Sequence, residues 1–217
     1  MKMLVIVALA SFFLIGLAIA QDNACALKPP KGASVALVEF EDLQCPDCAK
    51  VAPVVADAAA TYKIPVVLHA FPLTKHAWAH SAAVYAAFFD QYAAKQKGKT
   101  KKLGSGFRTY MYENQASVTP QNLRETVERF AKAHGVKLPE QIDPKGKLAA
   151  RVDTDIACGK SLNVVHTPTI YVVSSKQQGE PFIEVVDRSK LFEQIEAMTP
   201  DKSPEKATAK RAPASKK

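Results

Sequence analysis

The chain has 217 residues, with 29 Lys and Arg against 21 Asp and Glu and a formal net charge of +8. This length suffices for one compact domain, or for a core with an inserted subdomain. The basic runs at residues 95–102 and 199–217 contain no aromatic residues, which argues against a nucleic-acid-binding protein. We interpret these runs as solvated surface; the alternative is weak attraction of the basic tail to the cell envelope or a membrane surface.

The N-terminus has the pattern of a signal peptide over residues 1–20. Lys2 precedes an apolar stretch that ends in small residues of A-x-A type before Gln21. A cleaved signal implies a periplasmic or extracytoplasmic protein. The alternative is an uncleaved anchor, because the stretch is at the lower limit for spanning a bilayer. Residues 21–33 would form an N-terminal arm, and residues 199–217, rich in Lys, Ala and Pro, a disordered basic tail.

The first ordered unit, within residues 34–74, is a strand, a helix and a second strand. The apolar run at 34–40 predicts a buried strand, the alanine-rich segment 45–62 a helix, and residues 66–71 another strand. Such a βαβ unit makes its two strands parallel, with a right-handed crossover. Pro53 lies inside the helix and should kink it.

A long helical block follows, which we place at residues 75–164. Thr119-Pro120 and Asp143-Pro144 each give an N-cap residue followed by a proline suited to the first helical position. Gly104 and Gly106 belong to a glycine-rich segment that predicts a polar break after the first helix. The expected helices are 76–95, 107–114, 119–135 and 143–162.

Strand character returns in residues 165–198. Segments 169–173 and 182–186 predict two strands, which a turn at 174–181 joins into an antiparallel hairpin. Residues 188–198 predict a closing helix. The order is therefore β-α-β, a helical block, then β-β-α, without internal repeats.

The motif Cys45-Pro46-Asp47-Cys48 lies at the junction between the first strand and its helix. Cys45 would be at the helix N-terminus, where free amide groups and the helix dipole stabilise a thiolate, with Cys48 in the first turn. One cysteine could then attack a disulfide and the other resolve the mixed disulfide, so we favour a redox site. The alternatives are half of a zinc site, completed by a histidine pair of H-x3-H spacing, and a purely structural disulfide.

Two further features fit a redox site. Glu39 lies six residues before Cys45 and would point from the strand toward the base of the helix. A buried carboxylate there can take the proton of Cys48, the resolving cysteine. Thr167-Pro168 precedes the third strand, and a proline that begins a central strand favours a cis bond.

Together these residues resemble the thioredoxin superfamily in its DsbA-like branch. The resemblance covers residues 34–198 and rests on Val38-Glu39-Phe40 before the Cys45–Cys48 motif, Phe71-Pro72-Leu73, and Thr167 to Val172. It implies an α/β thioredoxin fold, a central mixed β-sheet flanked by helices, with an inserted α-helical subdomain. It also implies that the loop at Thr167 and Pro168 packs against the dithiol and binds substrate backbone, and that no cofactor and no metal is needed.

Three residues would tune the dithiol: Pro46, Asp47 and His166. The DsbA-like branch often has histidine at the position of Asp47. A carboxylate there should raise the pKa of Cys45 and make the couple more reducing. A threonine before the proline, as at Thr167, resembles the disulfide isomerase and reductase branches more than DsbA itself. This also argues for a more reducing couple. His166 beside the proline loop would either tune the thiolate or lie exposed, and we lean to tuning.

We therefore expect an enzyme, an extracytoplasmic protein thiol–disulfide oxidoreductase with Cys45 as nucleophile, Cys48 as resolving thiol and Glu39 as proton carrier. Its partners would be protein thiols and disulfides and a redox partner protein, without nucleic acid, and the chain would be a monomer. The oxidase, isomerase and reductase directions stay open, and so does a disulfide between Cys25 and Cys158. The competing class is a non-catalytic metal carrier or chaperone, because soft thiolates suit Cu(I).

Overall fold

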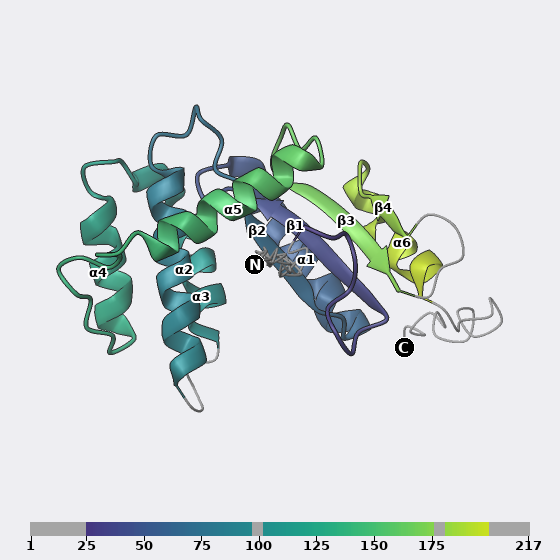
Figure 1. Cartoon of the computed structure of the whole chain (residues 1–217), viewed down its shortest axis with the longest axis horizontal. Helices are drawn as coiled ribbons and strands as arrows, with labels where there is room; N and C mark the ends of the chain where they lie inside the picture. Colours follow the sequence, from purple (N-terminus) through teal and green to yellow (C-terminus); the bar gives the residue numbers. More distant parts are fainter. Residues whose placement is uncertain (1–24, 97–101, 176–180, 200–217) are drawn as a thin grey trace, which may run out of the picture.

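The computed structural model describes residues 25–96, 102–175 and 181–199. Within them, four strands form one mixed sheet in the order β2-β1-β3-β4 (Figure 1). The strands are β1 (Val35–Glu41), β2 (Val66–Ala70), β3 (Thr169–Ser174) and β4 (Phe182–Glu184). β1 pairs in parallel with β2 and antiparallel with β3, and β3 pairs antiparallel with β4. The expected α/β fold is confirmed, whereas the expected signal peptide and the tail from residue 200 lie outside the described residues.

Helices cover both faces of the sheet, so that β1 is buried along its whole length. On one face, α1 (Pro46–Tyr62) and α6 (Leu191–Met198) pack against apolar side chains of β1 and β3. The 3-10 turn η3 (Arg188–Lys190) precedes α6. On the other face, Phe40 packs in a cluster with Phe71 and with Cys158 of α5 (Lys147–Ser161). A strand covered on both faces is a nearly continuous apolar run, and two glutamates in that run mark the site described below.

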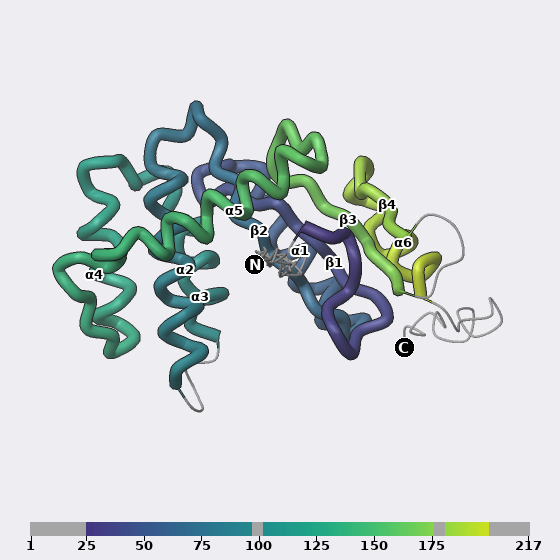
Figure 2. The backbone as a smooth tube through the Cα atoms, viewed as in Figure 1, coloured from purple at the N-terminus to yellow at the C-terminus, as the bar shows by residue number. Residues whose placement is uncertain are grey.

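Between β2 and β3 the chain forms a helical subdomain with its own apolar core (Figure 2). Its elements are α2 (Ala79–Lys95), α3 (Leu103–Asn114), the 3-10 turn η2 (Gln115–Ser117), α4 (Leu123–Ala133) and α5. At its centre the ring of Phe89 lies 4.7 Å from that of Phe107 and 5.1 Å from that of Phe130. No helix among the described residues is long and apolar enough to cross a membrane.

Several helix starts differ from the sequence-based expectation. α2 begins at Ala79 and not at 76, and α6 begins at Leu191 and not at 188. α5 begins at Lys147 and not at 143, because Gly146 is its N-cap and Asp143 accepts a hydrogen bond from the Ala149 amide at 2.9 Å.

The starts of α3 and α4 differ for reasons of packing and of turn geometry. α3 begins earlier than predicted, because Gly104 is a point of close packing and not a break: a Cβ there would collide with the carboxylate of Asp90 on α2. α4 begins later, after a turn in which Thr119 and Asn122 exchange side chain–backbone hydrogen bonds of 2.7 and 3.2 Å. Glycine weakens a helix, but in this one it lets two helices approach each other. Pro53 lies within α1 as expected, and its kink stays a prediction.

Candidate redox site

The two cysteines of the motif lie at the N-terminus of α1, both buried and both reduced. Cys45 is the N-cap residue and a proline follows it, so its sulfur lies beside the free amides of the first turn. In its protonated form, the Cys45 thiol donates a hydrogen bond to the backbone oxygen of Thr167 at 3.2 Å. The Thr167–Pro168 peptide bond is cis, as expected. The fold therefore brings the dithiol and the proline loop into direct contact.

The surroundings separate the two thiols chemically. The hydrogen bond with the Cys48 thiol is the largest influence on Cys45. Together with the backbone amides of Asp47 and Cys48, it lowers the pKa of Cys45 to about 5, although burial acts in the opposite direction. The same hydrogen bond, followed by burial, holds the pKa of Cys48 well above its usual value. Near neutral pH, Cys45 is therefore a thiolate while Cys48 keeps its proton, an asymmetry that suits a nucleophile and a resolving thiol.

Thr167 contributes its side chain as well as its carbonyl. The buried Thr167 hydroxyl oxygen has no hydrogen-bond partner among the described residues. The Thr167 side chain lowers the pKa of Cys45 further. A hydroxyl group can rotate to donate its proton, so Thr167 is placed to donate to Cys45 once that sulfur is ionised.

Glu39 lies on the face of β1 that α1 covers, and only 3% of the residue is exposed. Burial first, and then the negative charge of Glu41 on the same face, raise the pKa of Glu39 to about 8. The charge of Glu39 in turn raises the pKa of Cys48. A buried carboxyl group that titrates near neutral pH can accept and return a proton, which fits the role that the sequence predicts for Glu39.

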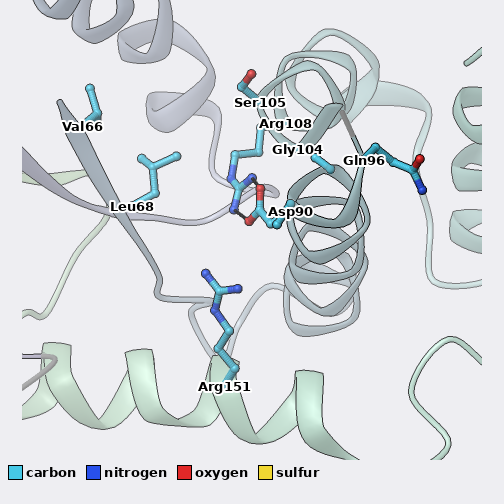
Figure 3. A pocket seen from close by; sticks show the side chains of 10 residues that line it. Val66, Leu68, Asp90, Gln96, Gly104, Ser105, Arg108 and Arg151 are labelled. Carbon is cyan, nitrogen blue, oxygen red and sulfur yellow. Dashed lines mark hydrogen bonds and ion pairs between the residues drawn. The ribbon is translucent and has the colours of Figure 1, made fainter. Parts of the chain in front are cut away.

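Sequence reasoning missed a buried charge network beside Glu39. Glu41 accepts hydrogen bonds from the Tyr112 hydroxyl, at 2.8 Å, and from Nε of Arg108, both of which belong to α3. Arg108 also donates from both terminal nitrogens to Asp90 of α2, at 3.0 and 2.9 Å (Figure 3). Such charge-assisted and bidentate pairs satisfy the hydrogen-bonding capacity of these side chains in a buried position. The available signal was the spacing: residues two apart on a strand share a face.

A second buried carboxylate, Asp42, fixes the turn that leads into α1. It accepts hydrogen bonds from Nδ1 of His76 at 2.6 Å, from the Leu73 amide at 2.8 Å and from the Gln44 amide at 2.7 Å. Its own backbone amide donates to the sulfur of Cys48 at 3.4 Å. The loop after β2 therefore holds the turn that carries the dithiol.

The histidine pair considered for a metal site is directed elsewhere. His76 binds Asp42, and Nε2 of His80 lies 3.2 Å from a carboxylate oxygen of Asp153. The described part of the chain contains no group of three or more His, Cys, Asp or Glu side chains arranged to hold a metal ion. The structure thus supplies no ligand set for the metal-carrier alternative within these residues.

The expected effect of Asp47 on Cys45 is wrong in direction. The pKa of Cys45 is lowered, and the part that Asp47 plays is to donate its backbone amide. Its carboxylate is 57% exposed and accepts a hydrogen bond from Lys50 at 3.2 Å, one helical turn further on. Because that charge lies in solvent and is paired, water screens it from the sulfur.

His166 lies exposed beside the proline loop. Its Nδ1 is 3.1 Å from the hydroxyl of Thr169, and His166 is not among the groups that shift the pKa of Cys45. The tuning role given to it therefore stays a prediction without structural support.

Cys25 and Cys158 form a disulfide, which settles the pairing that the sequence left open. Their Cα atoms are 5.1 Å apart, and the bridge closes a loop with a sequence separation of 133. It ties the N-terminal arm to the end of α5, where the chain turns toward the proline loop.

Comparison with known proteins agrees with this geometry. A family model described as thioredoxin matches residues 30–196. The chain belongs to the thioredoxin family. No curated protein matches the sequence. The similar solved structures are DsbA-like thiol–disulfide exchange proteins and their relatives, and at these low identities the likeness shows the fold.

Three of these structures illustrate the likeness. A double-cysteine variant of α-DsbA1 from Wolbachia pipientis has 15% sequence identity and a TM-score of 0.60 over 79% of this chain and 88% of its own. α-DsbA2 from Wolbachia pipientis has 15% sequence identity and a TM-score of 0.60 over 79% of this chain and 86% of its own. A periplasmic thioredoxin-like protein from Salmonella enterica serovar Typhimurium has 15% identity and a TM-score of 0.59 over 78% and 87%.

Proposed function

We propose that this protein catalyses thiol–disulfide exchange on protein substrates outside the cytoplasm, through the Cys45–Cys48 pair. The observation that carries the proposal is the chemical asymmetry of the two sulfurs. Cys45 has a pKa lowered to about 5 and contacts the cis-proline loop. Cys48 is fully buried and has a raised pKa. A stabilised thiolate beside the substrate loop and a protected second thiol are what a two-step exchange requires.

In the first step, the Cys45 thiolate attacks one sulfur of a substrate disulfide. A Cys45–substrate bond forms, the substrate S–S bond breaks, and the other substrate sulfur leaves as a thiolate that takes up a proton. In the second step, the ionised form of Glu39, which is the minor form at pH 7 because its pKa is about 8, accepts the proton of Cys48, and the Cys48 sulfur attacks Cys45. This releases the reduced substrate and leaves a Cys45–Cys48 disulfide. Oxidation of a substrate dithiol follows the same steps in reverse.

Substrate backbone would lie along the loop at Thr167 and Pro168. That loop touches Cys45 through the Thr167 carbonyl oxygen. Beside it, Val165 is 80% exposed, which offers an apolar contact to an unfolded chain. The substrates that fit this surface are extended or unfolded protein segments with exposed cysteines, and a separate redox partner protein would restore the dithiol. We propose that the protein acts as a monomer.

We further propose that the protein acts on the oxidising side. Stabilising the thiolate stabilises the reduced form and so makes the disulfide a better oxidant. A pKa of about 5 for Cys45 lies between values of about 7 for thioredoxin and 3.5 for DsbA. Their potentials are about −270 and −120 mV, and interpolation gives roughly −180 mV for this couple.

The deciding experiment is equilibration of the protein with glutathione redox buffers, combined with assays of both directions. A potential near −180 mV, with oxidation of reduced unfolded ribonuclease faster than reduction of insulin, would support the proposal. Cys45→Ser provides the control that removes the nucleophile. A protein that exchanges no disulfides in either assay, or a potential at or below that of thioredoxin, contradicts it.

A further inference from the structure

A pocket of about 460 Å³ is lined in part by Arg108 and Asp90, the pair that adjoins Glu41. Its walls come from the edge strand β2, the facing ends of α2 and α3, and Arg151 of α5, as Figure 3 shows. None of the four residues of the redox motif, nor the proline loop, lines it. The pocket is therefore separate from the dithiol site.

The wall formed by β2 is an open sheet edge, because β2 is the outermost strand. The bonds from Leu37 N to Pro65 O and from Phe71 N to Glu41 O show that the odd-numbered residues of this segment face β1. The even-numbered residues therefore direct their backbone N–H and C=O groups outward. The Ala70 amide confirms this, since it donates to Asp155 on α5 at 3.2 Å.

At Val66 and Leu68, the other two outward-facing residues, no hydrogen-bond partner is found for the outward amides among the described residues. Both residues line the pocket, and both are only partly buried. Exposed sheet edges usually carry charged side chains or proline, which discourage pairing with another chain. This edge carries two apolar side chains and free backbone groups, the features that strand addition uses.

The charges around the pocket select for an anion. Arg151 reaches from α5 into the pocket (Figure 3), and within the described residues it has no hydrogen-bond or ion-pair partner. The other two charged side chains that line it, Arg108 and Asp90, pair with each other, and Arg108 is further paired with Glu41. At the rim, Lys95 ends α2 and Lys102 precedes α3. The tail of the chain after residue 199 is basic, so its charge excludes it as the occupant.

We propose that this edge binds an extended acidic peptide segment of a partner protein, which adds to β2 as a fifth strand and pairs a carboxylate with Arg151. The backbone groups of Val66 and Leu68 would supply the ladder, and their side chains would contact alternate residues of the peptide. A small free anion would satisfy Arg151 but would leave the backbone groups and the apolar wall unused. The proposal does not depend on the redox chemistry of Cys45.

Binding can be measured by fluorescence anisotropy with the full oxidised protein and a labelled hexapeptide of alternating valine and glutamate. We expect saturable binding, and protection of the Val66 and Leu68 amides from hydrogen exchange. Arg151→Glu should weaken binding by about tenfold or more. Lys160→Glu, which changes an exposed basic residue on the same helix, should leave binding unchanged. Neither variant touches the dithiol site, so both should exchange disulfides normally.

Three controls separate this site from general charge attraction. A valine–lysine hexapeptide and a valine–glutamate hexapeptide with N-methylated backbone amides should both fail to bind. Leu68→Pro should abolish binding while the protein stays folded, because proline is tolerated where an edge strand directs its N–H outward. Equal binding of either control peptide, no effect of Arg151→Glu, or displacement of the peptide by millimolar acetate would overturn the proposal.

Discussion

Replacement of Glu39 by glutamine should stabilise the protein and slow its chemistry at the same time. The pKa of Glu39 is raised from 4.5 to about 8 in the fold. At pH 7 the unfolded chain carries an ionised carboxylate, which must take up a proton on folding. This uptake costs about 3 kcal/mol. Glutamine has the same shape but pays no such cost, although its amide needs hydrogen-bond partners of its own.

The free energy of unfolding should depend on pH in a direction that the raised pKa of Glu39 fixes. The native pKa of this acid is raised, so Glu39 reduces the free energy of unfolding increasingly as the pH rises above 4.5, and the loss levels off above pH 8. The gain in Glu39→Gln should therefore be near zero at pH 4 and roughly 2 to 3 kcal/mol at pH 7, or about 4–12 °C in melting temperature. No cysteine is among the groups that shift Glu39, so urea unfolding can use the oxidised protein.

The second readout is the resolving step, followed in single turnover from a preformed mixed disulfide at Cys45. If Glu39 accepts the proton of Cys48, its replacement should slow this step about 10²-fold or more. A stability gain that is the same at pH 4 and pH 7 would show that Glu39 does not titrate as described. An unchanged resolving rate with the expected stability gain would show that Glu39 is buried but is not the proton carrier.

Three other measurements test the site. The thiolate absorbance of reduced protein should titrate with a pKa near 5 and disappear in Cys45→Ser; a midpoint above 8 would contradict the thiol asymmetry. Asp47→Asn should change the reduction potential by less than about 15 mV, because its carboxylate faces Lys50, and a shift of 40 mV or more would restore the tuning role. Removing the second disulfide by paired alanine substitutions at Cys25 and Cys158 should lower the free energy of unfolding by about 2–5 kcal/mol; an unchanged denaturation midpoint would contradict this.

The fold and the dithiol could be predicted from sequence because their signals are local. The apolar run of β1, the helix after Cys45 and the proline at Pro168 each lie within a few residues of the feature they specify. Asp47 was misjudged although its signal was also local: Lys50 is three residues further along the same helix, where side chains meet. Proximity to Cys45 in sequence was given more weight than the direction of the side chain.

The charge network could not be predicted, because its members are distant in sequence. Arg108 meets Glu41 across 67 residues, and an arginine on a helix of mixed composition is typical of a solvated surface. Gly104 reads as a helix break for the same reason: only the packed structure shows Asp90 lying where its side chain would be. Long-range packing decides both cases, and a single sequence does not report it.

The network also bears on how the helical subdomain and the sheet depend on each other. Arg108 and Tyr112 belong to α3, whereas Glu41 belongs to β1 beneath the dithiol. Removing the Arg108 side chain would leave Glu41 in a buried position without its guanidinium partner, which typically costs about 3–5 kcal/mol. The insertion is therefore held to the core by buried charges as well as by apolar contacts. The charge of Glu41 helps to raise the pKa of Glu39. The packing of α3 against Glu41 therefore influences the proton transfer between Glu39 and Cys48.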